Sequence, residues 1–125
     1  MTSESANGNG VIKVEDKTYR KFEIKTGQYD EKSLTDEAKY VLNFVHAWLN
    51  NNKEFSFQTS GSTGKPKKIV LSKEVLSYSA QQTLKFLGLD GITDLNMLLC
   101  IPPQFIGGTM MVVRALESKA NLEVI

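Results

Sequence analysis

The chain has 125 residues, 41% of them hydrophobic and 23% charged, with a formal net charge of +1. These values are typical of one globular domain with a real core, and the near-balanced charge gives no general reason to expect nucleic acid as a partner. The single cysteine, Cys100, excludes an internal disulfide and fits a reducing cytoplasm. Because Cys100 lies in the apolar run 97–101, we expect a buried, inert thiol.

The N-terminal half predicts two strands and a helix. Residues 1–10 are rich in Ser, Asn and Gly, which indicates a disordered segment and no secretory signal. Short strands are expected at 11–14 and 18–24. Ser33 or Thr35 can cap a helix that ends at Asn50, and His46 within it is an ordinary solvated histidine. The apolar face of this helix recurs at helical spacing: Leu34, Ala38, Val41, Leu42, Val45, Trp48 and Leu49.

The C-terminal half alternates strands and helices. Apolar runs around 55–57 and 68–71 predict two strands joined by a loop, and Ser72 can cap a helix that runs to Leu87 before Gly88. Its inward face is expected to hold Leu76, Ala80, Thr83, Leu84 and Leu87. A buried strand at 97–101, a helix at 106–116 and a strand at 121–125 follow.

This succession predicts an α/β fold with a mainly parallel sheet and helices packed on it. The most apolar region, 95–116, is interrupted by prolines, glycines and Arg114, which argues against a membrane span. The last residues end inside an apolar run that is typical of a buried strand. We therefore expect the domain that begins at residue 11 to be cut short at Ile125.

The segment 58–67 reads Gln-Thr-Ser-Gly-Ser-Thr-Gly-Lys-Pro-Lys. Its glycines allow several backbone N–H groups to converge, and its hydroxyls and lysines add donors and positive charge, a combination that suits a polyphosphate. The glycine spacing and Pro66 after Lys65 exclude the P-loop of nucleotide hydrolases, and a dinucleotide-binding turn is absent. The alternative is a solvated Ser/Gly-rich hairpin loop without a ligand.

The nine residues from Thr59 to Lys67 resemble the phosphate-binding signature of the adenylate-forming superfamily, which includes acyl-CoA synthetases, firefly luciferase and the adenylation domains of peptide synthetases. The resemblance implies that the chain is the N-terminal part of the large AMP-binding domain. It also implies a set of residues that contact the ATP phosphates: Thr59, Ser60, Gly61, Ser62, Thr63, Gly64, Lys65 and Lys67. For Lys65, and for the neighbouring Lys68, a purely solvated position is the alternative.

A second segment, 101–116, is similar to the proline-aromatic-glycine stretch that lines the acyl pocket in this superfamily. The residues that would contact the acyl group are Gln104, Phe105, Gly107 and Gly108, for which plain core packing is an equal alternative. The N-terminal segment before the phosphate loop is short, and in this the chain resembles the 2-succinylbenzoate-CoA ligases of menaquinone synthesis. That resemblance implies a cytoplasmic ligase that uses ATP, Mg²⁺ and coenzyme A to convert a small carboxylate first to an acyl adenylate and then to an acyl-CoA.

The resemblance also implies that the segments that bind adenine and magnesium, the hinge and the lysine that promotes adenylation all lie beyond residue 125. We therefore expect no catalytic residue and no metal ligand in this chain, and no activity from it alone. Three alternatives stay open: a stand-alone nucleotide- or anion-binding module, another acyl- or aryl-CoA synthetase, and a nucleic-acid binder. The last is supported only by three lysines beside Phe55 and Phe57, and the balanced charge disfavours it.

Overall fold

The computed structural model describes residues 10–58, 64–65 and 67–125. Its main sheet has the order β2-β1-β6-β5, formed by β1 (Val11–Val14), β2 (Lys17–Arg20), β5 (Asn96–Leu99) and β6 (Asn121–Val124). The pairs β1–β6 and β5–β6 are parallel, and β1–β2 is an antiparallel hairpin. The predicted α/β fold with a mainly parallel sheet is thus confirmed.

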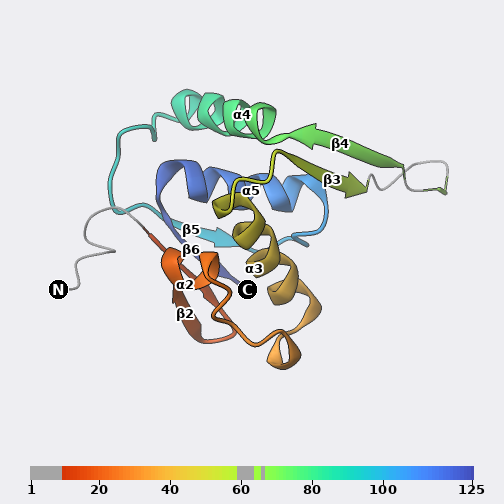
Figure 1. Ribbon diagram of the computed structural model, residues 1–125. Coiled ribbons are helices and arrows are strands. Elements are labelled where there is room, and N and C mark those ends of the chain that lie inside the picture. Colours follow the sequence, from red (N-terminus) through yellow and green to blue (C-terminus); the bar gives the residue numbers. More distant parts are fainter. Residues whose placement is uncertain (1–9, 59–63, 66) are drawn as a thin grey trace.

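Helices cover one face of this sheet in two layers (Figure 1). The helix α5 (Ile106–Ser118) follows β5 and leads the chain to β6. It is the crossover connection that two neighbouring parallel strands require. The helix α3 (Asp36–Leu49) contacts α5, and the short α2 (Lys21–Lys25) packs on α3. The 3₁₀ turn η1 (Glu31–Ser33) lies between α2 and α3 in the sequence. The outer layer contains α4 (Lys73–Phe86), which packs on α5.

The two longest helices begin as the sequence predicts. The Thr35 hydroxyl accepts a hydrogen bond from the Ala38 N–H at the start of α3, and the Ser72 hydroxyl accepts one from the Val75 N–H at the start of α4. Gly88 follows α4 with a φ of 71°, a left-handed conformation that suits glycine. The predicted apolar face of α3 is buried or half-buried, and Phe44 is buried with it.

The strands β3 (Glu54–Gln58) and β4 (Lys68–Ser72) are not part of the main sheet. Within the residues that the structure describes, they pair only with each other, as an antiparallel hairpin with Glu54 opposite Ser72 and Gln58 opposite Lys68. Figure 1 shows this hairpin leading into the N-terminal end of α4 and extending away from the four-stranded sheet. The predicted strand, helix, strand succession is therefore correct, but the step from β4 through α4 to β5 passes from one sheet to the other.

The second face of the main sheet is polar and accessible. Lys13, Glu123 and Leu98 lie in one row across β1, β6 and β5, and the Lys13 Nζ is 3.8 Å from the Glu123 Oε2. Leu98 is 49% exposed on this face, and the strand ends at Leu99, so the prediction of a buried strand at 97–101 is wrong in its burial and in its end. Cys100 lies just past β5 and is exposed, which overturns the prediction of a buried thiol.

Two further sequence predictions need correction. The strand expected at 18–24 ends at Arg20, and Lys21–Lys25 is helical because the Glu23 carboxylate accepts a hydrogen bond from the Arg20 N–H at 2.8 Å. Leu87, expected on the inward face of α4, is 58% exposed because the helix ends before it. The predicted disordered segment 1–10 lies outside the described residues except for Gly10, which is buried.

Lys21, at the start of α2, gives the fold a pH dependence. Burial lowers the pKa of its ammonium group from 10.5 to about 8, and Lys119 adds charge repulsion. Between these two values the unfolded chain binds more protons than the folded chain, so stability rises as the pH rises through this window. We expect Lys21→Met to increase the free energy of unfolding at pH 7 and to flatten its rise between pH 8 and pH 9, measured by urea denaturation.

The exposed Lys25 lies on the same helix and provides the control. Lys25→Met should leave the rise between pH 8 and pH 9 in place. A Lys21→Met profile parallel to that of the wild type would contradict the assignment of this pH dependence to Lys21.

Candidate functional site

The hairpin β3–β4 carries the segment that the sequence singles out. Phe55 and Phe57 alternate with exposed residues along β3 and are 8% and 2% exposed, so they attach one face of the hairpin to the core. Gln58 and Lys68 form its last pair. The predicted phosphate loop connects these two residues, at the end of the hairpin that points away from Lys53 and Ser72.

Most of the predicted phosphate-binding residues lie outside the described residues: Thr59, Ser60, Gly61, Ser62 and Thr63. Gly64, Lys65 and Lys67 are described, and all three are exposed. Gly64 has a φ of 89°, a conformation that side chains with a Cβ rarely adopt, so the chain needs glycine there even though the surrounding space is open.

A cavity of about 390 Å³ lies between the hairpin and the turn that precedes α5. Gln104 and Phe105, two of the predicted acyl-pocket residues, line it together with residues of the hairpin: Ser56, Phe57, Gln58 and Lys68. The structure thus brings Gln58 and Lys68, the residues that flank the predicted phosphate loop, together with part of the predicted acyl pocket. Lys68 is exposed, yet it lines this cavity, which the sequence alone did not indicate.

Gly107 and Gly108, the other two predicted acyl-pocket residues, do not line this cavity. Gly108 is buried, and a Cβ on it would lie 2.1 Å from the Pro102 carbonyl oxygen. Gly107 is exposed, and a Cβ there would meet only the Ile101 Cδ1 at 3.8 Å. The close backbone approach at Gly108 is what seats the turn 102–105 against the start of α5.

Thr109, which the sequence reading did not select, fixes the same turn. Its side chain is fully buried, and its hydroxyl donates to the Pro103 carbonyl oxygen at 2.6 Å. The Tyr40 hydroxyl on α3 lies 3.4 Å from this hydroxyl. The Thr109 N–H also donates to the Phe105 carbonyl oxygen at 3.0 Å. These contacts fix the turn that carries Gln104 and Phe105. The sequence signal for this role of Thr109 was only that a hydroxyl residue occurs in the apolar part of a helix.

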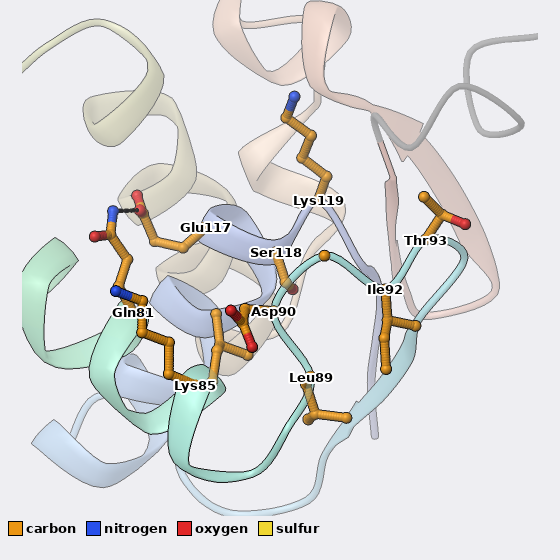
Figure 2. A pocket seen from close by; sticks show the side chains of 11 residues that line it. Gln81, Lys85, Leu89, Asp90, Ile92, Thr93, Glu117, Ser118 and Lys119 are labelled. Atoms are coloured by element: carbon orange, nitrogen blue, oxygen red, sulfur yellow. Dashed lines mark hydrogen bonds between the residues drawn. The ribbon is translucent and has the colours of Figure 1, made fainter.

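Larger cavities lie elsewhere. One of about 450 Å³ separates the C-terminal ends of α4 and α5, where the Gln81 amide donates to Glu117 at 2.7 Å (Figure 2). Another of about 660 Å³ lies at the opposite end of the hairpin, between the turn 51–54 and the first turns of α4. None of the predicted site residues that the structure describes lines either one.

No family model matches the sequence, and no curated protein matches it. Among solved structures, the chain is similar to the crystal structure of an acyl-CoA synthetase (AMP-forming)/AMP-acid ligase II-like protein from Dyadobacter fermentans DSM 18053. The two are 33% identical with a TM-score of 0.66, over 76% of this chain. This chain has the fold of part of an AMP-forming acyl-CoA synthetase. The match supports the predicted superfamily and does not distinguish its members.

The chain spans 28% of the length of that acyl-CoA synthetase-like protein. None of the helices among the described residues has the length and apolar character that crossing a membrane requires. Within the same residues, no three side chains of the His, Cys, Asp and Glu types gather in a group that could hold a metal ion.

Proposed function

We propose that this chain supplies the phosphate-binding part of an ATP-dependent carboxylate-CoA ligase. Such an enzyme joins a carboxylate to the α-phosphorus of ATP, releases pyrophosphate, and then lets the thiol of coenzyme A displace AMP. The observation that carries the ligase class is the 33% identity to an AMP-forming acyl-CoA synthetase-like protein over 76% of the chain. The phosphate-binding role is proposed on the resemblance of the segment from Thr59 to Lys67. We further propose 2-succinylbenzoate as the carboxylate, in menaquinone synthesis, on the resemblance of the segment 101–116 and the short N-terminal lead.

The phosphate loop has the chemistry that the first half-reaction needs. The carboxylate and the triphosphate are both anions, so a site must offset their repulsion before the two can approach in line. In the proposal, the hydroxyls of residues 59, 60, 62 and 63 donate to the β- and γ-phosphates. Gly61 and Gly64 allow close backbone approach, and Lys65 and Lys67 add positive charge.

The cavity beside the loop supports an acyl site in the same place. Its volume of about 390 Å³ falls within the usual range for small-molecule pockets. Phe105 offers an apolar wall and Gln104 a polar one, while Lys68 places a positive charge at its rim. A small carboxylate in this cavity would lie next to the end of the hairpin from which the phosphate loop extends.

The test is ATP–pyrophosphate exchange by the full product of the gene that encodes this chain. Thr63→Ala combined with Lys67→Ala should lower the exchange rate by about tenfold or more, because hydrogen bonds to charged phosphates are among the stronger ones. The matched control, Thr93→Ala with Lys85→Ala, removes an exposed threonine and an exposed lysine at a different cavity and should leave exchange unchanged. Equal exchange by both double variants would refute the role of the loop.

The same assay, run with different acids, tests the substrate and the alternative class. Exchange should be fastest with 2-succinylbenzoate, and a preference for a long fatty acid would overturn the menaquinone proposal while leaving the ligase in place. Binding of ATP without exchange for any acid would instead indicate a nucleotide-binding module that performs no catalysis.

A further inference from the structure

Lys73, the first residue of α4, joins three segments at the base of the hairpin. Its Nζ donates to the Trp48 carbonyl oxygen at 2.8 Å and lies 3.4 Å from the Asn51 Oδ1. The same ammonium group lies 4.9 Å from the centroid of the Trp48 ring, within cation–π range. The Lys73 N–H donates to the Lys53 carbonyl oxygen at 2.8 Å. One residue therefore holds the end of α3, the turn that follows it and the end of β4.

The contact with Trp48 is favourable for a definite reason. The Trp48 carbonyl oxygen lies in the last turn of α3, where it also accepts a hydrogen bond from the Asn51 N–H at 3.1 Å. This is the negative end of the helix dipole, so a cation placed there is stabilised. Lys73 supplies that cation from a residue 25 positions further along the chain. The bond is thus a tertiary contact that fixes where α4 and β4 meet relative to α3.

Trp48 extends the contact into the hairpin itself. Its ring stacks on Phe55 of β3 with centroids 5.6 Å apart, and Phe44 of α3 lies 4.8 Å from the same Phe55 ring. A two-stranded hairpin is marginally stable alone, and no other strand in the described part of the chain pairs with β3 or β4. Its orientation therefore depends on the aromatic contacts along one face and on the Lys73 contacts at its base.

The geometry of the hairpin amplifies any movement at that base. Four residue steps separate the pair Glu54–Ser72 from the pair Gln58–Lys68, which is about 13 Å at the usual rise per residue. A rotation of about 10° at the base then moves the far end by about 2 Å, more than a hydrogen bond tolerates. From this geometry we infer that Lys73 is a positioning residue for the end of the hairpin, the pair Gln58–Lys68, between which the proposed phosphate loop runs. The inference rests on the proposed function of that loop.

The decisive experiment measures the affinity of the full gene product for inorganic tripolyphosphate with Mg²⁺, by isothermal titration calorimetry. Lys73→Met keeps the aliphatic stem of the side chain and loses the charge, the hydrogen-bond donors and the cation–π contact. It should raise the Kd for tripolyphosphate by about tenfold, because Lys73 acts through a packed network of contacts. Lys73→Arg restores the charge and the donor over the Trp48 ring and should stay within about threefold of the wild type.

Two controls separate positioning from charge and from stability. Lys85→Met removes an exposed lysine from the same helix and should leave the Kd unchanged. Thr35→Ala removes the N-terminal cap of α3, far from the hairpin, and should lower the thermal midpoint without changing the Kd. Absence of tripolyphosphate binding in the wild type would refute the proposed function of the loop. Wild-type binding with an equal Kd in Lys73→Met would overturn only the inference about Lys73.

Discussion

Gly108→Ala should lower the free energy of unfolding by about 2 kcal/mol or more, as measured by urea denaturation, because added atoms in a closed site force backbone shifts. The new Cβ would lie 2.1 Å from the Pro102 oxygen and 2.7 Å from the Pro103 Cα, and both are backbone atoms that cannot rotate away. The start of α5 and the turn 102–105 would have to separate. Because Gln104 and Phe105 belong to that turn, the cavity beside the hairpin should change shape as well.

The neighbouring glycine is the matched control. Gly107→Ala places the same methyl group on the same helical turn, where it meets only the end of the Ile101 side chain at ordinary contact distance. Since alanine favours helix over glycine by up to about 1 kcal/mol, this variant should be neutral or slightly more stable. Equal destabilisation by the two substitutions would contradict the close-packing role assigned to Gly108.

Trp48→Ala should cost about 3–5 kcal/mol, the range for removing a large aromatic side chain from a core. The Trp48 side chain is 4% exposed and contacts Phe44, Phe55 and the Lys73 ammonium group. Its loss leaves a void where α3, the hairpin and α4 meet. The urea midpoint should fall strongly, and near-ultraviolet circular dichroism should show loss of the aromatic packing signal.

The control removes an aromatic ring that packs on little. Phe86, at the end of α4, is 89% exposed, so Phe86→Ala should change the free energy of unfolding by no more than about 0.5 kcal/mol. A small loss of stability for Trp48→Ala, comparable to that of Phe86→Ala, would mean that the aromatic cluster does not hold the hairpin to the core.

The helices were the most predictable part of the fold. In α3 and α4, caps at Thr35 and Ser72 and apolar residues at helical spacing are local signals, and the structure follows them to within a residue or two. The open face of the sheet left no such signal. The apolar run 97–101 reads the same whether one face of the strand is covered or both, so the exposure of Leu98 and Cys100 depends on tertiary contacts alone.

The candidate site was only partly predictable for a related reason. The segment 58–67 stands out because many unusual residues occur together, and its assignment to ATP stays a prediction. Thr109 and Lys73 are single residues in ordinary helical sequence, and their contacts join positions that are far apart along the chain. The meeting of the hairpin with Gln104 and Phe105 likewise depends on how separate elements pack.

The self-contained pairing of β3 with β4 has a consequence for sequence change. Strand register in a sheet is easily lost when one strand shifts by a residue, because every side chain then moves to the other face. Here the loop lies at the end of a ladder that shares no strand with the main sheet. Insertions or deletions between Gln58 and Lys68 therefore leave the register of the four-stranded sheet untouched. The segment proposed to bind phosphates can thus diverge in sequence while the fold that carries it is preserved.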